Sequence, residues 1–286
     1  MFLRCLLVPT APGINPTRRM DVALHLSQRL NAHIGVSFMA PGPEHVLANM
    51  ASLVPVDCAT IAAIEQGVRE AADAGRAAIL AWCGQRKVAF MTSSERLDAT
   101  FVSWSELSGE VEPLLTRVGR VNDLVIVDRP DPAQPFTGRA LDTSLFSVGR
   151  PTLMVGEPVT YDPLYHVVIA WNGSLEATRL IGQSITLLRK AERVTVLHVS
   201  TERFERGGAA ELCGYLRWHG IAAQAVTLPT KESISVGAAI LAEAKARDAT
   251  MLAMGAYTHS RVREFLLGGV TRHVIENARL PVLMGH

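Results

Sequence analysis

The last part of the chain combines apolar runs, glycines and basic residues in an order suited to binding an anion. The apolar run 249–254 ends on Gly255, and after a polar loop Gly268 and Gly269 open a helical segment. The loop carries three basic side chains, His259, Arg261 and Arg263. In a parallel α/β sheet, this order places backbone N–H groups and a helix dipole at the carboxyl edge of the sheet. The stretch therefore predicts a phosphate site, although a glycine pair also simply permits tight packing of a helix on a sheet.

Other patterns that carry chemistry in proteins are weak in this sequence. Gly173 and Ser174 lack the flanking residues of a nucleophile elbow, so we interpret Ser174 as a helix N-cap. His259 and His273 have no carboxylate or cysteine at ligand spacing, which predicts no metal site. The sequence has no G-x4-G-K-[ST] phosphate loop. We therefore predict no catalytic residue and no efficient ATPase.

The composition is that of a globular protein without a strong charge preference. The chain has 286 residues, of which 48% are hydrophobic and 19% charged, and its net charge is +1. This balance excludes a general attraction to nucleic acid or to an anionic membrane. No stretch approaches the length of a membrane span, and the four cysteines show no paired spacing. We expect a soluble, cytoplasmic protein with no nucleic-acid or membrane partner.

Strand-like and helix-like segments alternate twice along the chain. Strands are expected at 2–9, 33–39, 100–104, 124–127, 151–155, 166–171, 193–199, 223–228, 250–254 and around Val282. Helices are expected at 17–30, with Thr17 as N-cap, and at 59–84, 111–118, 140–148, 176–189, 209–219, 236–246 and after Gly268. Alternation of this kind predicts an α/β fold of parallel sheets with right-handed crossovers.

Two pairs of segments indicate an internal duplication. Residues 150–154 match 280–284, and residues 123–127 match 249–253. We predict two tandem doubly wound modules, residues 1–156 and 163–286, each with a five-stranded sheet.

The second module resembles the universal stress protein family, in its tandem form. The family signature G-x2-G-x9-G-[S/T] is matched in spacing by Gly255, Thr258, Gly268 and Gly269, with two of the four residue types changed. The resemblance extends to the turn at 170–174. It implies the strand order 3-2-1-4-5, a nucleotide pocket between strands 1 and 4, and pairing of fifth strands, here within one chain. The family acts in stress survival and signalling, and some members bind ATP while others do not.

The resemblance and the residues together predict a pocket for ATP or another adenine nucleotide. Asn172 would bond the base or ribose, Val199 and Met254 would wall the adenine, and backbone N–H groups at 268–270 would hold phosphates. The full set of candidate binding residues is Trp171, Asn172, Val199, Met254, Gly255, Thr258, Gly268, Gly269, Val270 and Thr271. Thr258 is the main departure, because a β-branched residue replaces a glycine there.

The first module lacks the glycine loop. Its counterpart runs from Asp128 through Arg129, Pro130 and Asp131 to Pro132, with Gly138 at the later glycine, and Thr10 stands where the other half has Asn172. Prolines remove N–H donors and aspartates repel phosphate, so we predict a degenerate module with a solvated loop.

Three functions remain open from the sequence. The first is a non-catalytic stress-response protein that binds an adenine nucleotide in its second module. The second is an interaction scaffold that has lost nucleotide binding. The third is a slow nucleotide hydrolase. We expect an intrachain pseudo-dimer through the fifth strands, and association of whole chains is left open.

Overall fold

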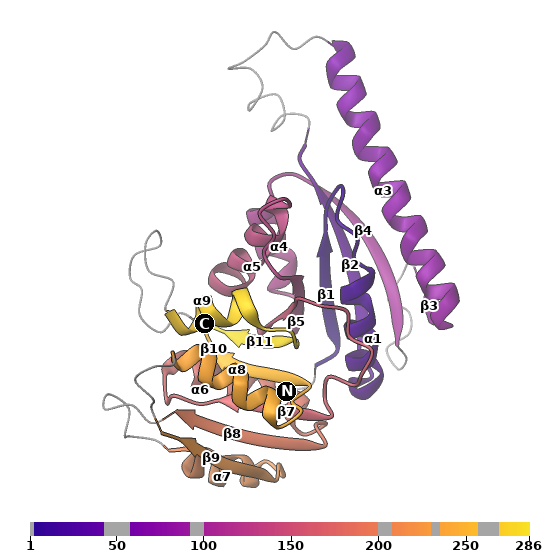
Figure 1. The fold of residues 1–286 in the computed structure, drawn as a ribbon. Coiled ribbons are helices and arrows are strands. Elements are labelled where there is room, and N and C mark those ends of the chain that lie inside the picture. The colour runs from indigo at the N-terminus through magenta and orange to yellow at the C-terminus, as the bar shows by residue number, and fades with distance from the viewer. Residues whose placement is uncertain (1–2, 43–57, 92–99, 200–207, 230–234, 257–268) are drawn as a thin grey trace.

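The computed structural model describes residues 3–42, 58–91, 100–199, 208–229, 235–256 and 269–286. Within these residues the strands form one mixed sheet of 11 strands in the order β3-β4-β2-β1-β5-β6-β11-β10-β7-β8-β9 (Figure 1). The described helices are too short or too polar to cross a membrane.

The first module contributes strands β1 to β6. Its strands are β1 (Cys5–Thr10), β2 (His33–Ala40), β3 (Ala89–Phe90), β4 (Phe101–Ser108), β5 (Leu124–Asp128) and β6 (Thr152–Val155). Its helices are α1 (Thr17–Leu30), α3 (Cys58–Arg86), α4 (Val111–Gly119), α5 (Pro135–Thr143) and the short η1 (Ser144–Val148).

The second module repeats the alternation. Its strands are β7 (His166–Ala170), β8 (Arg193–Val199), β9 (Ala223–Leu228), β10 (Met251–Gly255) and β11 (Val282–Gly285). Its helices are α6 (Leu175–Leu188), α7 (Ala209–Trp218), α8 (Val236–Ala246) and α9 (Gly269–Asn277).

Each module contains the strand order 3-2-1-4-5, which confirms the predicted α/β fold class, and in the first module the short strand β3 adds a sixth strand outside β4. The first module reads β4-β2-β1-β5-β6 and the second β9-β8-β7-β10-β11, with all neighbours inside a module parallel. The fifth strands β6 and β11 pair antiparallel, with Leu153 opposite Leu283, so the two sheets become one.

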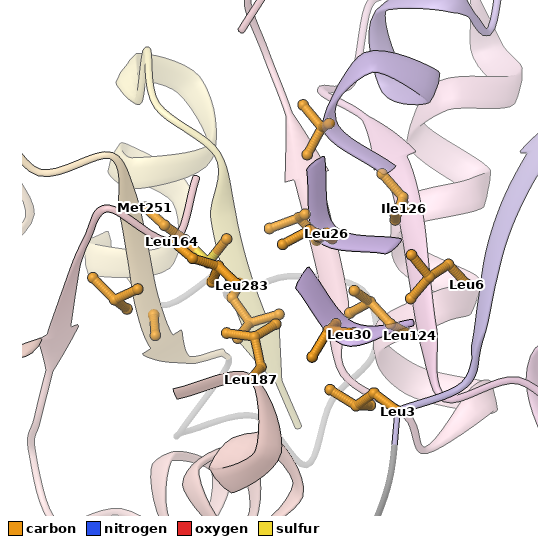
Figure 2. Close-up of a cluster of buried hydrophobic side chains, with 14 of the residues drawn as sticks. Leu3, Leu6, Leu26, Leu30, Leu124, Ile126, Leu164, Leu187, Met251 and Leu283 are labelled. Atoms are coloured by element: carbon orange, nitrogen blue, oxygen red, sulfur yellow. The ribbon is translucent and has the colours of Figure 1, made fainter. Parts of the chain in front are cut away.

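Helices cover both faces of the sheet, and each face has a core that runs through both modules. One core contains side chains from α1, α3, α6 and α7, and the other contains side chains from α4, α5, α8 and α9. Figure 2 shows the first core, to which the first module contributes Leu26 and Ile126 and the second module Leu164 and Leu283. Each fully buried side chain of this size contributes about 1.5–3 kcal/mol. Burial therefore joins the modules as well as stabilising each one.

Several element boundaries differ from the sequence-based expectation. Helix α5 begins at Pro135, five residues before the predicted start, because proline is favoured in the first turn. Thr17 is the first helical residue and not the N-cap, since Pro16 holds that position. Strand β4 extends to Ser108, and the two-residue strand β3 was not predicted.

The observed pairing also corrects the alignment of the two modules by one residue. Val127 pairs with Met154, and Met254 pairs with Met284. Since the fifth strands align by their shared Leu-Met sequence, Val127 corresponds to Met254 and not to Ala253. Asp128 therefore occupies the position of Gly255.

Candidate functional site

The carboxyl ends of three neighbouring strands in the second module carry Trp171, Val199 and Met254 of the predicted residues. Strand β7 lies between β10 and β8, and Ala170 pairs with Met254 in register. Trp171 directly follows β7 and donates its backbone N–H to Leu197 of β8 at 2.8 Å. Val199 ends β8 and is partly buried. The strand order reverses between β7 and β10, and ligands of open α/β sheets bind at such a point.

The turn after β7 is fixed by local hydrogen bonds. The Asn172 Oδ1 atom accepts a bond from the Ser174 backbone N–H at 3.1 Å, and Gly173 takes a left-handed conformation with φ +68°. The Ser174 Oγ atom accepts from the Ala177 N–H at 3.2 Å, which confirms Ser174 as the N-cap of α6. The Asn172 oxygen is thus used in the turn. Its amide NH₂ remains as the group able to donate to a ligand.

Gly255 has a packing role that its spacing did not reveal. It is the last residue of β10. A Cβ atom on Gly255 would lie 2.6 Å from the backbone N of Ala177 and 3.0 Å from its Cα atom. Glycine is therefore required for β10 to pack against the first turn of α6.

The described part of helix α9 runs from Gly269, the second residue of the predicted glycine pair, to Asn277. Gly269 is exposed, and no described atom lies within 4 Å of the position of a Cβ atom there. Val270 is partly buried, and the Thr271 side chain is buried in the helix packing. Thr258 and Gly268, together with the basic loop residues His259, Arg261 and Arg263, lie outside the described residues.

His198 adjoins this site and was missed by the sequence analysis. Its Nδ1 atom lies 3.1 Å from the Trp171 carbonyl oxygen, and its side chain is buried. The residue lies one position before Val199 in an apolar strand. A single histidine in such a strand belongs to no recognisable binding motif. Within the described part of the chain, no three potential metal ligands are grouped together.

The corresponding edge of the first module is filled by an ion pair. The Arg19 Nε atom lies 2.9 Å from Asp128 Oδ2, and the Arg19 side chain is only 1% exposed. Arg19 also donates to the Pro9 carbonyl oxygen. Burial raises the pKa of Asp128, and the neighbouring Arg19 and Arg18 oppose that rise. Asp128 is thus matched by a cation, which overturns the expectation that it simply repels phosphate.

The Asp131 loop of the first module is closed on itself. The Asp131 backbone N–H donates to Thr137 Oγ1 at 2.8 Å, and Asp131 Oδ1 accepts from the Ala133 N–H at 2.9 Å. Thr10, at the end of β1, is buried and donates to the Ile14 carbonyl oxygen at 3.0 Å. These groups bond to one another, so the loop of the first module is closed by its own hydrogen bonds.

A cavity of about 570 Å³ lies at the opposite, amino edge of the second module. His166 lines it, with Nδ1 2.9 Å from the Arg247 carbonyl oxygen and Nε2 2.9 Å from Thr195 Oγ1. Arg193 Nη2 lies 3.1 Å from the same Nδ1 atom. Burial lowers the pKa of His166. The cavity is lined by Glu192 and Asp248 as well as the two arginines, so it favours no ligand charge.

Comparisons with known proteins agree with this architecture. The model of the Universal stress protein family matches residues 223–286, which include β9 to β11. A universal stress protein from Archaeoglobus fulgidus has a similar structure, with TM-score 0.71 and 15% identity over 99% of this chain and 97% of that one. A putative universal stress protein from Pseudomonas aeruginosa matches with TM-score 0.56 and 13% identity, over 99% and 93% of the two chains.

A third structure, a functionally unknown protein from Pseudomonas aeruginosa, matches with TM-score 0.54 and 14% identity over 99% of this chain and 92% of that one. A search of curated proteins gives no match. In its C-terminal part the chain thus matches the universal stress protein family, and along nearly its whole length it has the fold of universal stress proteins.

Proposed function

We propose that this is a non-catalytic stress-response protein, acting in the cytoplasm, that binds an adenine nucleotide such as ATP in its second module. The proposal rests on the meeting of β7 and β10 at the point where the strand order reverses. Val199 and Met254 lie at the carboxyl ends of β8 and β10, Trp171 directly follows β7, and Asn172 adds an amide donor. Apolar walls with a few polar groups are typical of small-molecule sites.

The phosphates would be held at the start of α9. The first N–H groups of a helix have no partner within the helix, and the dipole adds about half a positive charge there. Gly269 leaves space for a phosphate to approach these groups, because no described atom lies near its missing side chain. The family match spans both β10 and this helix start, which supports the same assignment.

Binding is proposed in place of hydrolysis because of the chemistry at the β7 turn. The candidate polar group there is the amide of Asn172, which cannot act as a general base at neutral pH. The Ser174 hydroxyl is committed to capping α6. Nucleotide binding would then act by favouring one conformation or one partner interface of the protein.

The proposal is tested by calorimetry with ATP, ADP and AMP on the wild type and on Gly269→Val. The valine side chain would occupy the phosphate approach without disturbing the described packing, so we expect at least about tenfold weaker ATP binding. Gly182→Val is the matched control, because Gly182 is also an exposed helical glycine with open space around it. The control should bind ATP as the wild type does.

Three outcomes would contradict the proposal. Absence of heat and of a thermal shift at millimolar nucleotide would favour the interaction scaffold. Unchanged ATP affinity in Gly269→Val would show that the phosphates do not lie at the start of α9. Steady release of inorganic phosphate from ATP, abolished by Gly269→Val, would favour the slow hydrolase.

A further inference from the structure

The cavity of about 570 Å³ at the amino edge of the second module lies where three parallel strands begin. His166, Arg193 and Ala223 are the first residues of β7, β8 and β9, and all three line it. Arg247 and Asp248 line it from the end of α8. Small-molecule sites of proteins have volumes of about 300–1,000 Å³. The cavity therefore has room for a ligand, at the opposite edge of the sheet from the proposed nucleotide site.

Two of the charged side chains that line this cavity are already paired with other residues. Arg247 pairs with Glu243 of α8 at 2.6 Å, and Glu192 pairs with an arginine of α1 at 3.0 Å. Arg193 and Asp248 also line the cavity, and within the described residues neither forms an ion pair. The unpaired charges are thus one cation and one anion. They match a ligand that carries both charges and has no net charge.

His166 shows that these two charges lie close together. Its Nδ1 atom lies 3.1 Å from Arg193 Nη2 and 2.9 Å from the carbonyl oxygen of Arg247, the residue before Asp248. Burial is the main cause of the lowered His166 pKa, and Arg193 lowers this pKa further while Asp248 opposes the change. Both charges therefore adjoin the same edge of one imidazole ring, within reach of one small ligand.

The Arg193 Nη2 atom has no acceptor among the described residues. A histidine nitrogen either donates through its hydrogen or accepts, and it cannot do both. The shorter distance favours donation from His166 Nδ1 to the Arg247 carbonyl oxygen, so Nδ1 does not accept from Arg193. A carboxylate binds a guanidinium through two parallel hydrogen bonds. A carboxylate in the cavity would therefore supply the acceptor that Arg193 lacks.

A second cavity of about 290 Å³ adjoins the first and is mostly apolar. Its lining residues lie at the end of α7 and the start of β9, and they are Cys213, Arg217, Gly220, Ile221, Ala222 and Ala223. Ala222 and Ala223 line both cavities. Arg217 is the one charged residue among these six, and it is exposed, so its charge stays in water. The two cavities together fit a ligand with a charged head and an apolar side chain.

We propose that these cavities bind a free α-amino acid with an apolar side chain, such as leucine. Arg193 binds the α-carboxylate, Asp248 binds the α-ammonium, and the apolar side chain lies against Ala222 and Ala223. An α-amino acid carries its two opposite charges only a few bonds apart, which suits two side chains that adjoin one ring. The site is separate from the proposed nucleotide site and does not depend on it.

The test is calorimetric titration of the full chain with L-leucine. The wild type should bind one leucine, and Arg193→Gln and Asp248→Asn should each bind it at least about tenfold more weakly. Asparagine tolerates the left-handed backbone of residue 248, with φ +52°, so Asp248→Asn removes the charge without straining the chain. Arg189→Gln is the matched control, because Arg189 is an exposed arginine at the end of α6 that lines neither cavity. The control should bind leucine as the wild type does.

Two leucine derivatives test which residue binds which charge. L-Leucinamide lacks the carboxylate and N-acetyl-L-leucine lacks the ammonium, so the wild type should bind both at least about tenfold more weakly than leucine. Arg193→Gln should not weaken leucinamide binding further, and Asp248→Asn should not weaken N-acetylleucine binding further, because the interaction that each variant loses is already absent. Equal weakening of all three ligands in either variant would show a merely structural effect and would overturn the proposal.

The remaining outcomes separate this site from the nucleotide site. Leucine binding that persists in Gly269→Val and is lost in Arg193→Gln supports the proposal, whatever the result with ATP. Absence of leucine binding to the wild type at millimolar concentration would overturn it. Equal leucine affinity in wild type and Arg193→Gln, or tighter binding of glutamate than of leucine, would overturn it too.

Discussion

At the residue scale, Gly255 and Asp128 occupy the same position in the two modules and make different contacts. Gly255 packs against Ala177, the third residue of α6, while Asp128 pairs with Arg19, the third residue of α1. One module thus joins its fourth strand to its first helix by close backbone packing, and the other does so by a buried ion pair. The glycine pattern was visible in the sequence, but its steric cause was not, because Ala177 is distant along the chain.

Gly255→Ala should destabilise the second module. The added Cβ atom would lie 2.6 Å from the backbone N of Ala177, so the strand or the helix must shift. Overpacking of this kind costs about 1–3 kcal/mol, measurable by urea unfolding. Gly269→Ala is the matched control, because its Cβ atom meets open space and should change stability far less. Equal stability of Gly255→Ala and wild type would contradict the packing role.

His166 should make stability depend on pH in the mildly acidic range. Burial lowers its pKa in the folded state, so the unfolded state binds more protons below about pH 6.5, the ordinary histidine value. Stability therefore falls as the pH drops below that value and is level above it, as far as His166 contributes. His166→Gln should flatten this slope between about pH 5 and 6.5 in urea titrations. An unchanged slope would show that His166 is not responsible.

At the element scale, the β6–β11 pair joins the modules, and its apolar contacts should outweigh the surface ion pairs. Leu283→Ala removes a fully buried side chain and should cost about 2–5 kcal/mol. Arg29→Ala breaks ion pairs from α1 to Asp162 and Glu192, but these groups are partly exposed, so the cost should be at most about 1 kcal/mol. Thermal unfolding should show a larger loss of stability in Leu283→Ala than in Arg29→Ala. A larger loss in Arg29→Ala would contradict this expectation.

Most elements were predictable because their patterns are local. Buried parallel strands read as continuous apolar runs, and the alternation of strands with helices fixed the fold class. Strand β3 was missed because two residues carry no periodicity. The one-residue error in aligning β5 with β10 arose because neighbouring apolar residues look alike until the pairing with β6 and β11 is known.

At the scale of the whole molecule, the two modules share one sheet and two cores but differ at their carboxyl edges. The spacing of the glycines alone led to the prediction of a pocket in the second module. It could not find the Arg19–Asp128 ion pair, because these two residues come together only through the fold. The two modules therefore share one frame but differ in the contacts at their carboxyl edges.

The most direct test of this account is native mass spectrometry of the full chain with added ATP. The account expects one ATP per chain, and an at least about tenfold weaker affinity for ATP in Gly269→Val. Gly182→Val should retain the single ATP. A wild-type chain without bound nucleotide would contradict the proposed function, and two ATP molecules per chain would contradict the difference between the modules.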